Sequence, residues 1–194
     1  MSQPLLLLHA IAGAGHTRAT HAVSAVLGQG GDTDHRVVDM LDCATALLRK
    51  RYTQANIDLV QRMSALWGCF HDRADQVKPE SKSARKRLAF NKINRRAFKH
   101  LLAEIAPSGI ARPHFLPLEL LSNLKSRGKL AAVPAVSSDV SLYGFWVCPH
   151  IDHHHVATPD GARELQRKGV DAARLARPDA ACAVTDRLLA AVGR

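Results

Sequence analysis

The sequence predicts an α/β domain with a mainly parallel sheet, and three observations carry this prediction. Residues 5–11 form a short, continuous apolar run that ends in glycines, which is typical of a buried strand. Residues 17–27 place apolar side chains at helical spacing. A second β-branched run ends at Asp39. A strand, a helix and a strand in this order form a βαβ unit, which requires a parallel sheet.

The rest of the chain continues the alternation of helices and strands. Helices are expected over residues 41–50, 56–70, 81–103, 118–127 and 159–168. Gly128 and Gly169 are expected to end the last two, and Thr158 followed by Pro159 makes a good N-cap and first turn. Strands are expected over residues 107–111, 130–137 and 151–157, so the sheet has about five strands.

Length and charge narrow the range of possible functions. The 194 residues suffice for one well-cored domain, and a net charge of +10 predicts an anionic partner: nucleic acid, an acidic lipid surface or a phosphorylated ligand. The four cysteines form no C-x-x-C pair, which favours reduced thiols in the cytoplasm. No segment reaches membrane-spanning length, and residues 5–8 are too short for a secretory signal, so we expect any membrane contact to be peripheral.

The turn after the first strand is the main candidate site. Gly13, Ala14 and Gly15 stand where a ligand can approach the backbone and where the N–H groups of the helix's first turn attract anions. His16 follows them, and its imidazole can act as a general base on a bound hydroxyl. A dinucleotide site is an alternative, with Asp39 on a ribose hydroxyl, although Arg18 replaces the third glycine of G-x-G-x-x-G. A tight turn without a ligand is another.

Residues 81–103 are strongly basic and contain no acidic residue up to position 103. The family resemblance described below implies that this segment contacts an anionic membrane surface and that Trp67, from the preceding helix, serves as an interfacial anchor. A solvated basic face over an ordinary core stripe is the alternative, and no nucleic-acid-binding pattern accompanies the charges. The expected membrane-contact residues are Trp67, Arg85, Lys86, Arg87, Lys92, Arg95, Arg96 and Lys99.

Three consecutive histidines, His153 to His155, suggest a metal site at first sight. Neighbouring residues on a strand point to opposite faces, so only His153 and His155 share a side, and no carboxylate stands at ligand spacing. We therefore expect no bound metal.

Several stretches of the chain, in order, resemble the monogalactosyldiacylglycerol synthases and the processive diacylglycerol glucosyltransferases. The opening "AIAGAGHTRAT" is similar to S-x-x-G-x-G-H-x-x-A-A of that family. The others are "HRVVDMLDCA", "ALWGCF", "HFLPLELLSNLKSRGKL" and "SDVSLYGFWVCPHIDHHHVATPDGARELQRKGV". The likeness covers about residues 4–175.

The resemblance implies a Rossmann-like three-layer domain, equivalent to the N-terminal half of a GT-B glycosyltransferase. That half binds the lipid acceptor and touches the membrane, so the implied partners are diacylglycerol and an anionic lipid surface on the inner face of the cell membrane. His16 becomes the catalytic base. Residues implied to line the acceptor or phosphate site are Gly13, Ala14, Gly15, Thr17, His114, Phe115 and Asp139.

The sequence departs from the family pattern in several places. Pro113 stands for the threonine before His114, and Tyr143 stands for a histidine. Residues 176–194 read as a C-terminal helix instead of the start of a donor domain. We therefore expect residues 1–175 to form an acceptor-side domain that is truncated and inactive alone. The nucleotide-sugar donor, the only cofactor implied, then requires a donor domain such as a separate partner chain. The alternatives are a non-catalytic module that binds lipid or an anion, and a nucleotide-binding oxidoreductase.

Overall fold

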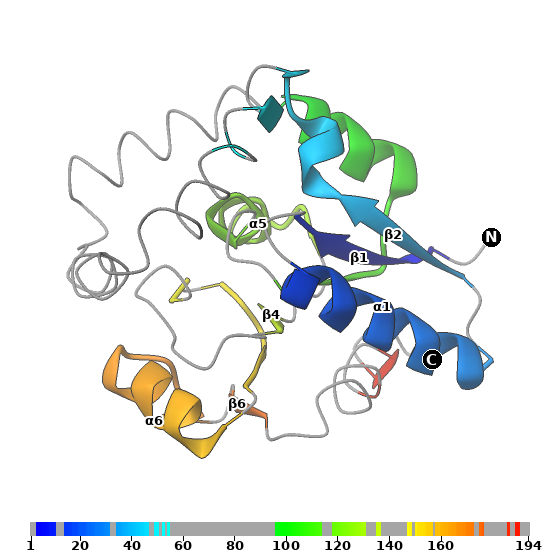
Figure 1. Ribbon diagram of the computed structural model, residues 1–194. Coiled ribbons are helices and arrows are strands. Elements are labelled where there is room, and N and C mark those ends of the chain that lie inside the picture. The colour runs from blue at the N-terminus through cyan, green and yellow to red at the C-terminus, as the bar shows by residue number, and fades with distance from the viewer. Residues whose placement is uncertain are drawn as a thin grey trace, which may run out of the picture.

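In a computed structural model, the chain forms two parallel three-stranded sheets with helices packed on them (Figure 1). The first sheet has the order β2-β1-β3 and the second has the order β4-β5-β6. The residues that the structure describes are 3–10, 14–31, 34–46, 49–50, 52, 54, 96–113, 118–130, 135–136, 147–148, 150–156, 158–172, 175–176, 186 and 189–190.

The first sheet is built around β1 (Leu5–His9), the fully buried leucine strand that the sequence predicts. It pairs in parallel with β2 (His35–Asp39) on one side and with β3 (Gly109–Ala111) on the other. The chain therefore runs from β1 to β2 on one side and then crosses over β1 to form β3 on its other side. This reversal of strand order makes the carboxyl end of β1 a topological switch point, where parallel α/β sheets bind ligands.

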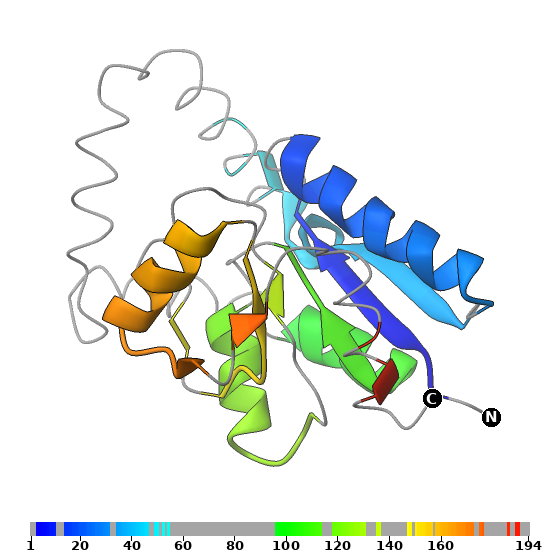
Figure 2. The same ribbon diagram turned by 90° about the horizontal axis from the view of Figure 1, so that it is seen from below.

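The side chains of alternate leucines in β1 point to opposite faces of this sheet. Leu5 and Leu7 pack against Val23 and Leu27 of α1 (Ala14–Gln29). Leu6 and Leu8 pack on the other face, against helical residues 96–105 and against α5 (Leu118–Lys125). Figure 2 shows the resulting three layers, with α1 on one side of the strands and the two other helices on the opposite side. The expected Rossmann-like α/β architecture is thereby confirmed.

Helix α1 begins three residues earlier than the apolar spacing predicts. Ala14, Gly15 and His16 lie in its first turn together with Thr17, whereas the sequence placed these three residues in the turn before a helix that begins at Thr17. The apolar pattern starts late because these residues occupy the end of the helix that extends beyond the apolar core. Ser24 Oγ lies 2.8 Å from Nε2 of His35, and this hydrogen bond ties α1 to the start of β2.

The second sheet consists of β4 (Ala135–Val136), β5 (His154–His155) and β6 (Leu175–Ala176), all parallel. The sequence did not predict β6. Because Ala176 belongs to this strand, the expected C-terminal helix does not begin at residue 176. In that segment the structure describes Asp186, Leu189 and Ala190 as helical, and the side chain of Leu189 packs against the α1 face of the first sheet.

Helix α6 (Pro159–Arg167) follows β5 with the caps that the sequence predicts. Thr158 Oγ1 accepts the Gly161 N–H at 3.1 Å, and Gly169 ends the helix with a φ of 94°. The Val170 N–H then donates to the Leu165 carbonyl at 3.0 Å, and the two side chains share one buried cluster. Together these contacts make a Schellman motif with its usual apolar contact.

The remaining described elements are short. A 3₁₀ helix, η1 (Met40–Cys43), replaces the start of the helix expected over residues 41–50, and residues 46, 49–50, 52 and 54 are helical. The expected helix over residues 56–70 and most of the basic segment lie outside the described residues. In the helices that the structure describes, no stretch is long and apolar enough to cross a membrane.

Candidate functional site

The candidate site lies at the carboxyl end of β1, where the strand order reverses. Chain leaving β1 at His9 reaches the first turn of α1 within a few residues. The N–H groups of a helix's first turn have no carbonyl partner inside the helix, and they carry the positive end of its dipole. Gly15 belongs to this turn, and a methyl group added at its Cα position would meet no atom within 4 Å. The backbone here is therefore open to a ligand.

His16 lies on the face of α1 that is directed toward the sheet. It belongs to a helical stripe with Thr20, Val23 and Leu27, which are all buried, whereas His16 itself is half-buried. The Thr20 hydroxyl donates to the His16 carbonyl at 3.0 Å and so fixes this first turn. His16 therefore stands at the partly exposed end of a buried stripe.

The space directly beneath α1 is closed to a ligand. Thr20, Val23 and Arg112 help to line a void of only about 10 Å³ between the helix and the ends of β1 and β3. This is about the size needed for one water molecule. Within the part of the chain that the structure describes, this void is too small for a larger ligand, so the candidate site is above the strand ends, beside Gly15 and His16.

A pair of buried polar residues, His9 and Asp39, ends the two neighbouring strands β1 and β2. They are register partners, and their side chains are only 7% and 8% exposed. Asp39 Oδ1 accepts the Leu41 N–H at 2.9 Å and caps η1, but Oδ2 of Asp39 and Nδ1 of His9 are buried with no hydrogen-bond partner. A buried polar atom without a partner is costly, so a hydroxyl-bearing ligand at this edge would gain by satisfying them.

Burial lowers the pKa of His9 below its ordinary value of 6.5, and the neighbouring His21 lowers it further. The carboxylates of Asp39 and Asp42 act in the opposite direction. The His9 and His21 rings lie 6.1 Å apart, centroid to centroid. The neutral imidazole of His9 is therefore favoured near neutral pH, as either a donor or an acceptor of one hydrogen bond at Nδ1.

Arg112, which immediately follows β3, is the largest fully buried side chain among the described residues. Its burial lowers the pKa of the guanidinium to about 9, and Cys148 acts in the opposite direction. Neither His9 nor Arg112 was predicted as a site residue from the sequence. The signal for His9 was present, since one polar residue ends a run of four leucines and so stands at the carboxyl edge of a parallel sheet.

The sequence-predicted site residues divide into three groups. Ala14, Gly15, His16 and Thr17 come together in the first turn of α1. Arg96 is exposed and Lys99 is half-buried on helical residues 96–105, whose Phe98 and Leu102 belong to the core. The others lie outside the described residues: Gly13, Trp67, Arg85, Lys86, Arg87, Lys92, Arg95, His114, Phe115 and Asp139. The roles assigned to all these residues stay predictions.

The triple histidine does not form the alternating strand that the sequence predicts. Only His154 and His155 lie in β5, and both are buried, whereas His153 precedes the strand and is half-buried. Within the described part of the chain, no group of three or more histidine, cysteine or acidic side chains could hold a metal ion.

Comparison with known families decides the relationship of this chain. The family model of monogalactosyldiacylglycerol (MGDG) synthase matches residues 16–177, which is more than half of the chain. The chain belongs to the MGDG synthase family. A search of curated proteins found no match. Membership in the MGDG synthase family indicates a glycolipid glycosyltransferase. The residues that match the family model begin at His16 and extend through α6 to just past the end of β6.

Proposed function

We propose that this MGDG synthase domain binds a diacylglycerol acceptor at the carboxyl end of β1 and presents its free hydroxyl to His16. The observation that carries the proposal is the position of His16. It stands in the first turn of α1, on the sheet-facing stripe, at the point where the strand order reverses. The ester oxygens of the glycerol head can accept from the N–H groups of that turn and from the buried Nδ1 of His9 when this nitrogen carries its proton.

In the proposed reaction, the His16 imidazole takes the proton of the acceptor hydroxyl as the oxygen attacks the anomeric carbon of a nucleotide sugar. The new bond joins that oxygen to the sugar, and the bond from the sugar to the nucleotide diphosphate breaks. The diphosphate leaves with the bonding electron pair. An imidazole suits this role because its pKa lies near neutral pH, and a positioned base contributes about 10²–10⁴ in rate.

The nucleotide sugar itself is proposed to be held by a second, donor-binding domain, with catalysis in the cleft between the two. This division of labour follows the family resemblance. It makes the nucleotide sugar the only cofactor-like ligand of the reaction, with no metal ion. The sugar transferred is a hexose, as in the family's name. The domain described above then contributes the acceptor-binding site, the base and the membrane contact.

The basic segment of residues 81–103 is proposed to hold the protein peripherally on the anionic inner leaflet of the cell membrane. Arg96 is the described residue that supports this, because it is exposed at the start of helical residues 96–105. Each lysine or arginine close to an anionic surface contributes about 1 kcal/mol. Phe98 and Leu102 are buried in the core, so they do not insert into lipid, and attachment through this helix rests on charge.

The proposal is tested by combining the full chain with the donor domain of a family member and measuring hexosyl transfer to diacylglycerol in mixed micelles. His16→Ala should reduce transfer by about a hundredfold or more. His100→Ala is the matched control, since His100 is exposed and lies on another helix, with its Nδ1 atom 3.9 Å from Oε2 of Glu104. Unchanged melting temperatures would show that both variants fold.

Two outcomes would overturn the proposal. Full activity of His16→Ala would remove the assigned base. Lipid binding without transfer, under every combination with a donor domain, would instead show a non-catalytic module that binds lipid or an anionic ligand.

A further inference from the structure

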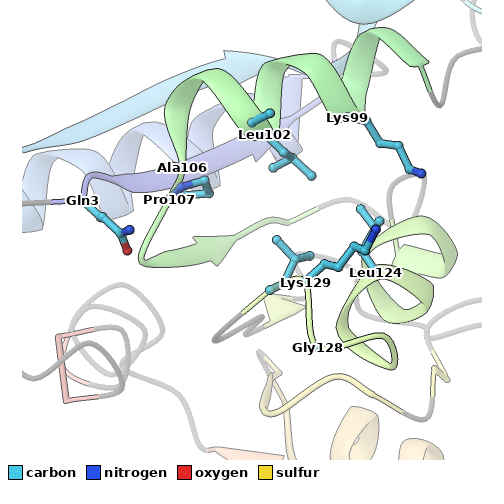
Figure 3. A pocket seen from close by; sticks show the side chains of 10 residues that line it. Gln3, Lys99, Leu102, Ala106, Pro107, Leu124, Gly128 and Lys129 are labelled. Carbon is cyan, nitrogen blue, oxygen red and sulfur yellow. The ribbon is translucent and has the colours of Figure 1, made fainter.

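A groove of about 610 Å³ lies at the opposite end of the first sheet from His16. Gln3, just before β1, and Pro107, just before β3, both line it, so it opens at the amino ends of the strands. Its walls are the last turns of helical residues 96–105 and the end of α5 (Figure 3). The volume falls within the range of small-molecule sites in proteins.

The lining of the groove is apolar along its length and basic at one end. The apolar part consists of aliphatic side chains and one proline: Leu102, Ala103, Ala106, Pro107, Leu124 and Leu130. The charged groups among its lining residues are two lysines, Lys99 and Lys129, and none of these lining residues is acidic. Figure 3 shows both lysine side chains directed toward the same end, with Gln3 at the other.

The end of α5 explains why Lys129 and Leu124 meet here. Gly128 has a φ of 66°, and the Lys129 N–H donates to the Leu124 carbonyl at 3.1 Å, which makes a Schellman motif. In such motifs an apolar residue at the position of Lys129 usually covers the residue at the position of Leu124, as Val170 covers Leu165 at the end of α6. A lysine occupies this position here and adds a cation beside the apolar lining of the groove.

The other wall is also fixed by its backbone. Ala106 ends the helical residues 96–105 with a φ of 46°, a left-handed conformation that a residue with a side chain rarely adopts. Ser108 then donates from its N–H to the Pro4 carbonyl at 3.0 Å and from its hydroxyl to the Gln3 carbonyl at 2.9 Å. Strained backbone of this kind concentrates at functional sites.

We propose that this groove binds a single aliphatic chain with an anionic head, a carboxylate or a phosphate monoester. The head lies between the ammonium groups of Lys99 and Lys129, and the chain lies along Leu102, Leu124 and Pro107. The charge of the lining selects an anion, and the apolar walls select an alkyl body over a sugar or a nucleotide. The site is separate from the acceptor site at His16, and it does not depend on the function proposed there.

The experiment titrates the full chain with dodecanoate, monododecyl phosphate, dodecanol and inorganic phosphate, each below its micelle-forming concentration, by isothermal calorimetry. We expect one molecule of dodecanoate or of monododecyl phosphate to bind per chain, and the tighter of the two identifies the head. Dodecanol and inorganic phosphate should bind at least tenfold more weakly. Equal binding of dodecanol, binding of phosphate alone, or no binding of either anionic amphiphile would overturn the proposal.

Substitutions at the groove test whether the ligand binds there. Ala103→Trp fills the groove from an exposed helical position and should abolish binding. Lys129→Glu should weaken dodecanoate binding about tenfold, whereas Lys50→Glu, an exposed lysine elsewhere, makes the same charge change and should have no effect. Equal losses in the two charge variants would show non-specific attraction and contradict the proposal. His16→Ala should bind dodecanoate normally, which separates this site from the proposed acceptor site.

Discussion

His9 is the one polar residue in a strand that otherwise consists of four leucines. The strand alternation puts it on the α1 face with Leu5 and Leu7, where it meets His21 of α1 and Asp39 of β2. Its burial is as deep as that of a core residue, yet its Nδ1 atom has no partner. A residue of this kind weakens the fold, and its presence at the candidate site fits a role in holding a ligand.

The same burial makes His9 a source of acid sensitivity. Its pKa is lowered in the folded protein, so between that pKa and the unfolded value of 6.5 the unfolded chain binds more protons, and stability falls as pH falls. Burial is the main cause of this lowered pKa; His21 lowers the pKa further, and Asp39 and Asp42 raise it. We predict that His9→Leu reduces the loss of unfolding free energy between about pH 7.5 and pH 5.5, measured by urea denaturation. An unchanged loss would contradict this account.

A substitution at Gly15 distinguishes an effect on the stability of the fold from an effect on ligand binding at the candidate site. Its φ lies outside the left-handed region and no atom stands within 4 Å of the methyl group that an alanine would add, so Gly15→Ala should leave stability unchanged or raise it by up to about 1 kcal/mol. The added methyl nevertheless projects where the acceptor approaches the backbone. We predict an undiminished melting temperature together with at least tenfold lower transfer in the presence of a donor domain. Normal transfer would show that no ligand approaches this turn.

At the scale of elements, the sequence predicts the bounds of a helix or strand most reliably where an apolar run and the local caps agree. Residues 5–9, with only leucines before the terminal histidine, and α6, with Thr158 and Gly169 at its two ends, match their expected positions closely. The start of α1 was predicted late because its first turn carries candidate site residues, and none of those whose side chains the structure describes belongs to the buried core. Strand β6 was missed because two residues give no periodic pattern, and only pairing with β5 defines them.

The two helices α6 and α1 give a matched pair of glycine substitutions. Gly169 has a φ of 94°, where a Cβ atom is disfavoured, whereas Gly28 lies exposed in α1 with nothing within 4 Å. We predict that Gly169→Ala lowers the free energy of unfolding by about 1 kcal/mol or more. Gly28→Ala should raise it by up to about 1 kcal/mol. Chemical denaturation measures both, and equal effects would mean that the Schellman turn contributes nothing.

At the scale of the whole molecule, the topology brings together what the sequence shows only as separate segments. The switch point at β1 follows from the parallel pairing of β1 with both β2 and β3. The βαβ pattern predicts the pairing with β2, but the position of β3 on the other side of β1 comes only from the structure. The pairing of His9 with Asp39 follows from the same register. The groove could not be predicted, because residues 3, 99–107 and 124–130 meet only through the packing of two helices on one sheet face.

The net charge of +10 also acts at this scale. We predict that the protein binds vesicles containing anionic lipid and that the affinity falls steeply as salt rises, because the Debye length shortens to about 8 Å at physiological ionic strength. Arg96→Glu should weaken sedimentation with such vesicles about tenfold. Arg167→Glu, an equally exposed position on α6, is the control. Equal losses would show that the face bearing Arg96 is not the membrane-contact face.

The central claim is that His16 removes the proton of the acceptor hydroxyl, and the pair of kinetic constants for His16→Ala tests it most directly. A base that acts only in the transition state affects kcat and leaves acceptor binding alone. With a donor domain present, we predict a fall in kcat of about 10²–10⁴ and a nearly unchanged KM for diacylglycerol. An unchanged kcat, or a loss confined to KM, would contradict the account.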